Sequence, residues 1–172
     1  FFVTSFENHV YRCAGGGCAV FVRNAGTNLR GVVVLPGRQV LVVDYDSKTV
    51  VKYSIAGGLE QSAADGVLFA DAGIVGESID PYGITVSPAG EVVYLADYSY
   101  GQPLAFTARG DYLGRVADRI GVNCNPPGIA VLPGPLAPFS RFDAGWADGP
   151  LVAGEPASIA IAPPIRSSVL PT

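Results

Sequence analysis

Two carboxylates with a spacing that could hold a metal ion follow one apolar run of the sequence. Asp44 and Asp46 lie two residues apart directly after residues 40–43, and an Asp-x-Asp pair at a strand end can begin the oxygen cage of a calcium site. No further carboxylate follows in the same register. The alternative is structural, because Asp44, and Asp97 after a second apolar run, can accept backbone N–H bonds in the turns that follow. We predict turn caps at both positions and no metal.

The cysteines suggest a cross-link within a hairpin. Cys13 and Cys18 are separated by Ala-Gly-Gly-Gly and flanked by β-forming residues. This arrangement suits a disulfide that closes the neck of a hairpin, which requires Cα atoms within about 7 Å; two free thiols are the alternative. A disulfide would indicate an oxidising compartment, so we expect an extracellular or cell-surface protein. Cys124 is left over, and could be buried or pair outside this segment.

No catalytic motif accompanies these residues. His9 is the only histidine, and it stands where a turn enters a strand, which favours an exposed turn residue over a ligand. There is no Gly-x-Ser-x-Gly elbow, and the three glycines at 15–17 lack the Lys-Ser or Lys-Thr of a phosphate-binding loop. A serine triad built on His9 stays open without further support. We predict no catalytic residues and no cofactor.

Three tyrosines share the turns of the two aspartates. Tyr45 follows Asp44, and Tyr98 and Tyr100 follow Asp97, so we expect the three rings to gather on one rim of the fold. Exposed tyrosine beside Asp and Ser is suited to recognition of a protein or a glycan. The alternative is that these rings pack between neighbouring structural units.

The composition favours many short elements over a few long helices. The 172 residues include 22 glycines and 14 prolines, and 49% are hydrophobic. The net charge of −4 and the scattered Lys and Arg residues argue against nucleic acid. No apolar run approaches the length of a membrane span. There is no Met, and the first residues already resemble a strand, so we expect a segment of a longer polypeptide.

Short β-forming runs dominate the sequence. Residues 32–35, 40–43 and 50–55 are rich in β-branched and aromatic side chains and are bounded by Gly, Pro, Asp and Ser, which predicts strands joined by hairpins. The best helical candidate, residues 59–72, contains Gly66 and many small residues and lacks a clear period. We predict an all-β fold.

These runs repeat. Each copy begins with Gly and three β-forming residues, reaches Pro five residues later, turns on Gly, and continues through an apolar strand to Asp-Tyr. We assign the Gly and Pro of the three copies to structural turns: Gly31 and Pro36, Gly83 and Pro88, Gly128 and Pro133. A weaker fourth copy has Ser158 at the Gly position. The N-terminus fits the back half of a unit, with Ser5 and Phe6 in place of Asp44 and Tyr45.

The best-preserved copy, DPYGITVSPAGEVVYLAD at residues 80–97, resembles the NHL-type β-propeller repeat. The resemblance covers residues 1–135 and implies blades that are antiparallel four-stranded meanders. The Asn-x-Arg that the family has after the Asp appears as Ser-Lys-Thr at 47–49 and Tyr-Gly-Gln at 100–102, so these blades are divergent. The family includes receptors, scaffolds and enzymes, so the resemblance implies a fold and not one activity.

The number of units is smaller than a closed ring needs. At about 45 to 50 residues each, the chain holds three to four units, whereas propellers close with about 4–8 blades and the resemblance implies about six. We therefore expect an incomplete ring or a segment of a larger propeller. The remaining blades would come from further sequence, or from a partner that pairs with open edge strands.

Residues 136–172 differ from the rest. Proline there forbids regular sheet and favours an extended segment, with a possible partial further blade. Trp146, beside Phe139 and Phe142, could anchor this segment onto a neighbouring surface.

These observations predict a non-enzymatic β-propeller module for protein or glycan recognition or for extracellular structural assembly, for example as a filament subunit. Its partners would be proteins, glycans or further copies joined through open blade edges, with no nucleic acid and no membrane span. The alternative, which the resemblance implies, is a calcium-dependent lactonase- or esterase-like six-bladed hydrolase that would use a carboxylate site such as Asp44.

Overall fold

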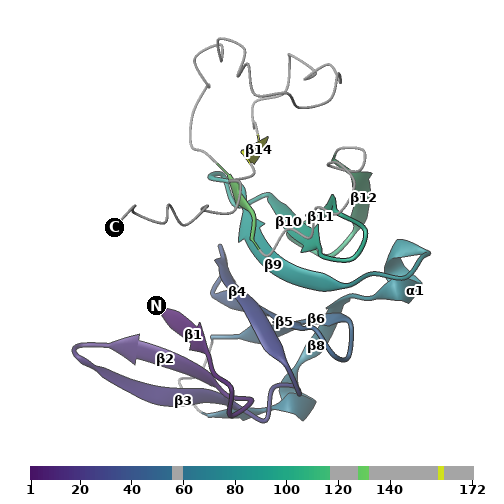
Figure 1. Ribbon diagram of the computed structural model, residues 1–172. Coiled ribbons are helices and arrows are strands. Elements are labelled where there is room, and N and C mark those ends of the chain that lie inside the picture. The colour runs from purple at the N-terminus through teal and green to yellow at the C-terminus, as the bar shows by residue number, and fades with distance from the viewer. Residues whose placement is uncertain (56–59, 117–127, 132–158, 161–172) are drawn as a thin grey trace, which may run out of the picture.

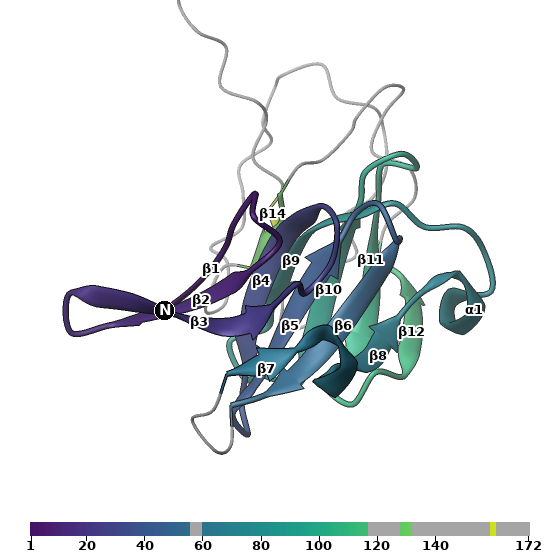
Figure 2. The same cartoon turned by 90° about the horizontal axis from the view of Figure 1, so that it is seen from below.

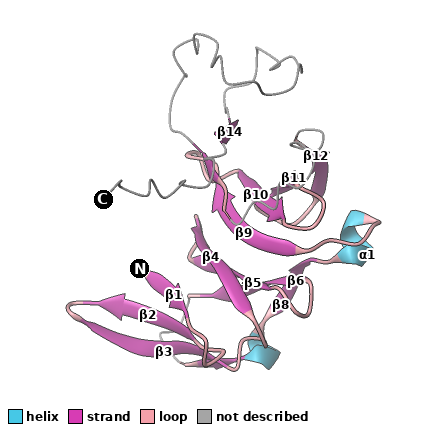
Figure 3. Cartoon of the chain, in the orientation of Figure 1, coloured by secondary structure: helices cyan, strands magenta, loops and turns pink. Residues whose placement is uncertain are grey.

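The structure is a computed structural model that describes residues 1–55, 60–116, 128–131 and 159–160. Three four-stranded sheets make up most of these residues, each built around consecutive antiparallel hairpins (Figures 1 and 3). The prediction of an all-β fold made of four-stranded units is confirmed. The described helices are short, η1 (Ala63–Asp65) and α1 (Ala72–Val75), and neither is long and apolar enough to cross a membrane.

The strand order of each sheet follows the order of its strands along the chain. The first contains β1 (Phe2–Thr4), β2 (Val10–Ala14), β3 (Gly17–Arg23) and β7 (Gln61–Ser62). The second contains β4 (Leu29–Leu35), β5 (Gln39–Asp44), β6 (Thr49–Ser54) and β8 (Val67–Ala70). The third contains β9 (Pro81–Val86), β10 (Val92–Asp97), β11 (Gln102–Thr107) and β12 (Tyr112–Arg115).

The second sheet is buried on both faces because a sheet lies on either side of it. Val40 and Val42 of β5 belong to the apolar cluster shared with the first sheet, while Leu41 and Val43 belong to the cluster shared with the third. Side chains alternate between the two faces of a strand, so a strand between two sheets must be apolar throughout. This explains why residues 40–43 form an unbroken apolar run.

The repeated glycines bring the inner strands together. Gly31 and Gly83 lie inside β4 and β9, so they are strand residues and not turn residues. A Cβ atom at Gly31 would lie 2.9 Å from the carbonyl oxygen of Tyr82 and 2.9 Å from Ile84 Cγ2. β4 and β9 can therefore lie side by side at this distance only because residue 31 has no side chain.

The repeated prolines do lie in turns. Pro36 lies between β4 and β5, and Pro88 between β9 and β10. Gly90 in the second of these turns has a φ of 77° and donates its N–H to the Ser87 carbonyl at 2.8 Å. The Gly90 backbone also packs against the Pro36 ring. Equivalent turns of neighbouring sheets therefore contact each other at this end of the fold.

The first sheet differs from a meander at its outer edge. β7 belongs to the connection between β6 and β8 and pairs in parallel with β3, with Val22 opposite Gln61 and Arg23 opposite Ser62. The connection thus crosses from the second sheet to the first, where Glu60 forms an ion pair with Arg23. β7 thus adds a parallel edge strand to a sheet whose other strands, β1–β3, form an antiparallel meander.

The turn after β1 has the geometry of the turn after β5. Asn8 has a φ of 64° and donates its N–H to the Ser5 carbonyl, and Lys48 has a φ of 57° and donates to the Tyr45 carbonyl. β1 is therefore equivalent to β5, the second strand of a unit, in agreement with the alignment of the N-terminus. Unlike β5, β1 pairs on one side only within the described residues.

A small sheet continues the series. β13 (Ala130–Val131) pairs antiparallel with β14 (Ile159–Ala160) and lies beside β9. The third copy of the repeat, after Gly128, and the weak fourth copy thus contribute to one sheet. Pro133, Cys124, Trp146 and most of residues 136–172 lie outside the described residues.

Candidate functional site

Three tyrosine rings meet where the second and third sheets adjoin. Tyr45 follows β5, Tyr82 lies at the start of β9, and Tyr98 follows β10. The Tyr82 and Tyr98 rings are stacked with centroids 5.1 Å apart, and Tyr45 meets them edge-on at 5.7 Å and 6.2 Å respectively. All three residues are half-buried. The expected gathering of tyrosines therefore includes inter-sheet packing, which was the alternative to a recognition surface.

Arg30 completes this group, which we call the tyrosine–arginine rim (Arg30, Tyr45, Tyr82 and Tyr98). Its guanidinium carbon lies 5.0 Å from the centroid of the Tyr82 ring and 5.8 Å from that of Tyr45, within the range of cation–π attraction. The Nε atom is buried and has no hydrogen-bond partner among the described residues. The ion pairs of the described residues are formed by Arg23, Lys48 and Arg115, so Arg30 has no ion-pair partner among these residues.

The repeat explains how the rim is built. Arg30 precedes Gly31 as Tyr82 precedes Gly83, and Tyr45 and Tyr98 follow the aspartates that end β5 and β10. Each of the two units thus supplies one residue before its inner-strand glycine and one after its Asp. Sequence analysis missed Arg30 and Tyr82, although their position next to the aligned glycines was a signal that could have identified them.

Tyr100, the third tyrosine expected on the rim, is separate from this ring cluster. Tyr100 is exposed, with 45% of its surface accessible to solvent. Its backbone N–H donates to Asp97 Oδ1 at 3.4 Å. The structure therefore brings together two of the three predicted tyrosines, Tyr45 and Tyr98, and leaves Tyr100 exposed in the same turn as Tyr98.

Asp44 joins the connection before β4 to the turn after β5. Oδ1 accepts the Asn28 N–H at 3.0 Å, and Oδ2 accepts the Thr27 N–H at 3.2 Å and the Ser47 hydroxyl at 2.8 Å. Burial opposes ionisation of this carboxyl, but the hydrogen bonds from Ser47, Asn28 and Thr27 outweigh it and hold its pKa below the ordinary value. Asp44 has the bonds of a turn cap, and most of them reach backward along the chain.

Asp97 occupies the equivalent position with fewer donors. Its Oδ1 accepts the Asp80 N–H at 3.2 Å and the Tyr100 N–H. The residue is 3% exposed, and burial raises the pKa of its carboxyl above the ordinary value. The pKa values of the two equivalent aspartates are thus shifted in opposite directions, because hydrogen bonds outweigh burial at Asp44 and burial outweighs hydrogen bonds at Asp97.

The carboxylate pair considered for calcium is engaged with protein donors. Asp46 Oδ1 accepts the side-chain N–H of Asn28 at 2.8 Å, next to the bonds that Asp44 receives. Among the residues that the structure describes, no group of three or more His, Cys, Asp or Glu side chains could hold a metal ion.

One ion pair links the second sheet to the third. Lys48 Nζ, in the turn between β5 and β6, lies 2.7 Å from Asp80 Oδ1, just before β9. Burial raises the pKa of Asp80, but the hydrogen bonds from Lys48 and Ser99 outweigh it and lower the pKa overall. The hydrogen bond to Asp80 raises the pKa of Lys48.

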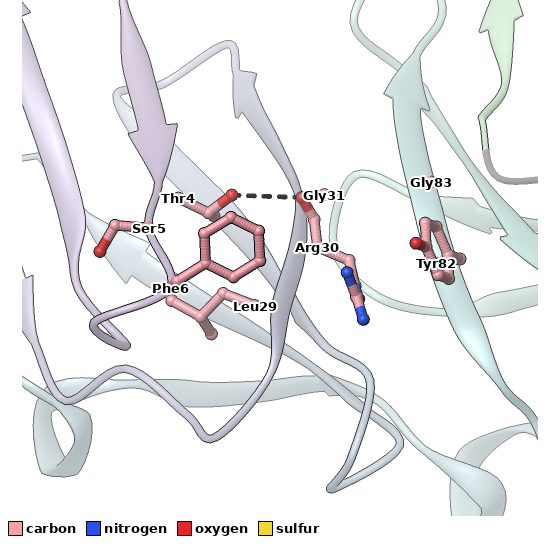
Figure 4. A pocket seen from close by; sticks show the side chains of 8 residues that line it. All are labelled: Thr4, Ser5, Phe6, Leu29, Arg30, Gly31, Tyr82 and Gly83. Carbon is pink, nitrogen blue, oxygen red and sulfur yellow. Dashed lines mark hydrogen bonds between the residues drawn. The ribbon is translucent and has the colours of Figure 1, made fainter.

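A pocket of about 300 Å³ lies beside the rim (Figure 4). The turn after β1 and the starts of β4 and β9 form its walls, and the lining residues are Thr4, Ser5, Phe6, Leu29, Arg30, Gly31, Tyr82 and Gly83. The Thr4 hydroxyl donates to the Arg30 carbonyl at 3.2 Å, which fixes β1 against β4. Phe6 is 98% exposed. The residues that line the pocket therefore carry one cation, three hydroxyls and two aromatic rings.

The disulfide and the histidine lie away from this pocket. Cys13 and Cys18 are joined with their Cα atoms 4.0 Å apart, in the β2–β3 hairpin that projects from the sheets (Figure 2). His9 is half-buried before β2, and its Nδ1 accepts the Asn24 N–H at 3.2 Å. His9 thus holds the turn against the end of β3.

No protein-family model and no curated protein sequence matches the chain. Solved structures do match it. A luciferin-regenerating enzyme aligns over 71% of the chain with a TM-score of 0.58 and 13% identity. Regucalcin from Agrobacterium tumefaciens, a calcium-binding protein, aligns over 73% with a TM-score of 0.55 and 14% identity. A chain of the nidogen–laminin complex aligns over 74% with a TM-score of 0.55 and 18% identity.

These structural neighbours are β-propeller proteins, and the likeness shows that this chain has the β-propeller fold. The aligned region covers 39%, 41% and 46% of those three chains, so this chain spans less than half of their length. At such low identity the likeness extends to the fold alone.

Proposed function

We propose that this chain is a non-enzymatic recognition module that binds a glycan or protein ligand at the tyrosine–arginine rim. The observation that carries the proposal is the position of Arg30, a cation held against Tyr45 and Tyr82 beside an open pocket. Tyr and Arg are enriched among the residues that dominate binding energy. Packing of the rings against one another holds these side chains in place before a ligand binds.

The aspartates support binding over hydrolysis. Asp44 receives hydrogen bonds on both oxygens, and Asp97 receives two backbone N–H bonds on Oδ1. A carboxylate with these bonds serves the turn around it and has less capacity left for a metal ion or for proton transfer. In the competing hydrolase function, the same two groups would be the reactive carboxylates.

We further propose that the blades are of the NHL type and that the protein is extracellular or on the cell surface. The inner-strand glycines, the Pro-containing turns and the Asp-Tyr strand ends support the first part. The Cys13–Cys18 disulfide supports the second, since disulfides persist in oxidising compartments.

An assembly role has one specific observation in its favour. β1 is equivalent to β5, yet its inner side lacks the strand that β4 provides for β5 among the described residues. An unpaired edge can accept a strand from further sequence or from another copy. Light scattering on the purified chain separates these sources: growth of oligomers with concentration supports self-assembly, and a monomer at all concentrations contradicts it.

Arrays of defined glycans and defined peptides, probed with the labelled 172-residue chain, test the recognition function. We expect binding that is lost in Tyr82→Ala and retained in Tyr11→Ala, because Tyr11 lies on β2 and its hydroxyl bonds Glu7. Thermal unfolding of both variants checks that they are folded. Hydrolysis of lactones or esters by the wild type, abolished by substitution of Asp44 or Asp97, would instead establish the hydrolase.

A further inference from the structure

The pocket beside the rim has a positive charge without a partner in the described part of the chain. Arg30 lines the pocket, and its Nε is buried and makes no hydrogen bond there. Arg30 as a whole is half-buried, so part of its side chain stays accessible although Nε does not. A partly buried cation attracts an anion more strongly than a cation in open solvent does, so an anion that enters the pocket would supply the missing counter-ion.

The tyrosines orient the guanidinium. Tyr82 lies 5.0 Å and Tyr45 5.8 Å from the Arg30 guanidinium carbon, and Figure 4 shows the Arg30 side chain between Tyr82 and the side of the pocket formed by Phe6 and Leu29. A guanidinium held in one orientation presents a planar fork that matches the two oxygens of a carboxylate. The geometry favours a carboxylate because one fork satisfies both of its oxygens.

The other lining residues indicate which kind of molecule would carry the carboxylate. Phe6 and Tyr82 offer aromatic surface, while Thr4 and Ser5 offer hydroxyls. Ser5 Oγ accepts the His9 N–H at 3.4 Å, which leaves its own hydrogen free to donate to a ligand. A volume of about 300 Å³ lies at the lower limit of small-ligand sites and suits one ring with polar substituents.

We infer that this pocket binds a carboxylate-bearing sugar unit, a uronic acid, with the carboxylate on Arg30, the sugar ring against Phe6 or Tyr82, and a hydroxyl on Ser5. The inference rests on the proposed recognition function and names the ligand class of the same site. The net charge of −4 disfavours a densely charged polyanion, so the sugar would be recognised through one carboxylate at a time.

Protein-observed NMR titration of the full chain with D-glucuronate and with D-glucose tests the inference. We expect a dissociation constant on the order of 1 mM for glucuronate, as a ligand of this size allows, and binding of glucose at least about tenfold weaker. Raising the salt concentration from about 20 mM to about 500 mM should weaken glucuronate binding and leave glucose binding unchanged.

Substitutions at Arg30 separate charge from fork geometry. Arg30→Gln should weaken glucuronate binding at least about tenfold and abolish the preference over glucose. Arg30→Lys keeps the charge without the fork, so its loss should be intermediate. Arg109→Gln is the matched control because Arg109 is an exposed residue of the β11–β12 turn. If Arg30→Gln fails to fold, Arg30→Lys together with the glucuronate-to-glucose ratio of the wild type decides the question.

The outcomes distinguish this inference from the proposed function. Equal affinity for glucuronate and glucose, or no glucuronate binding at all, would overturn the assignment of a uronic acid as the ligand. The proposed recognition function, with another ligand, would remain intact. Tighter binding of a glutamate-containing peptide than of glucuronate would overturn the uronic acid assignment in favour of a protein partner. If the wild-type chain binds no glycan and no peptide on the arrays and no glucuronate in the titration, both the uronic acid inference and the proposed recognition function are overturned.

Discussion

Lys48 and Asp80 form an ion pair across the boundary between the second and third sheets, with a distance of 2.7 Å between Nζ and Oδ1. Lys48 is half-exposed and Asp80 nearly buried, with accessible side-chain fractions of 50% and 12%. The pair joins the turn after β5 to the residue before β9, so it holds two successive units in register beside the tyrosine–arginine rim.

Removal of this pair should loosen the boundary between the sheets. We expect Lys48→Ala to lower the melting temperature slightly at neutral pH, because solvent screens an exposed partner. The lowered pKa of Asp80 means that the stabilisation from this group is present above its unfolded pKa of about 3.9 and is lost as the pH falls through the folded pKa. Thermal unfolding of both proteins at pH 7 and pH 3 should therefore show a difference that disappears in acid; an equal difference at both values would contradict it.

The two equivalent aspartates should respond differently to amide substitution. Both carboxylate oxygens of Asp44 accept hydrogen bonds in the wild type. In Asp44→Asn, an NH2 group replaces one of these oxygens, and it donates where the oxygen accepted. We expect a loss of about 1–3 kcal/mol in the free energy of unfolding. In Asp97→Asn, the amide oxygen can keep both hydrogen bonds that Oδ1 accepts, from the Asp80 and Tyr100 N–H groups, and we expect a change below about 1 kcal/mol. Urea unfolding at pH 7 measures both, and equal losses would contradict this account of the caps.

The pH dependence of the same variants follows from the pKa shifts. Hydrogen bonds lower the pKa of Asp44, so its contribution is present above its unfolded pKa and lost as the pH falls through the folded value. Burial raises the pKa of Asp97, so its contribution is present below the unfolded pKa and lost as the pH rises through the folded value. From pH 3 to pH 7, wild type should gain stability over Asp44→Asn and lose stability relative to Asp97→Asn. Parallel pH profiles would contradict the assignment.

Gly31→Ala should separate the inner strands. The added Cβ would lie 2.9 Å from the Tyr82 carbonyl oxygen, so β4 or β9 must move, at a cost of about 1–3 kcal/mol. Gly17→Ala is the control because a Cβ there meets nothing within 4 Å. Chemical denaturation of both variants measures the difference, and equal stability of the two would show that the inner strands are not held together as closely as described.

Reduction of the Cys13–Cys18 disulfide should destabilise the projecting hairpin. A cross-link across a loop this short contributes about 2 kcal/mol through chain entropy, and the effect should be local because the hairpin tip extends from the sheets (Figure 2). Amide hydrogen exchange with and without reductant should show faster exchange in residues 10–23 and little change in β9–β12. Uniformly faster exchange would contradict a local role.

Much of this architecture could be predicted because the repeat is local. The Gly, Pro and Asp-Tyr positions identified the hairpins, and the two Tyr residues after the Asp residues do meet. The parallel pairing of β7 with β3 could not be predicted, because it depends on contacts between residues nearly forty positions apart. Arg30 and Tyr82 carried a usable signal in their positions before the aligned glycines, but neither residue type by itself indicated a site.

The central claim is that the tyrosine–arginine rim binds a ligand. Surface plasmon resonance of the immobilised 172-residue chain against the strongest glycan or peptide from the arrays tests it most directly, using wild type, Tyr82→Ala and Tyr11→Ala. The account predicts at least about a tenfold loss of affinity for Tyr82→Ala and a change of less than about twofold for Tyr11→Ala. Unchanged affinity of a folded Tyr82→Ala variant would contradict it.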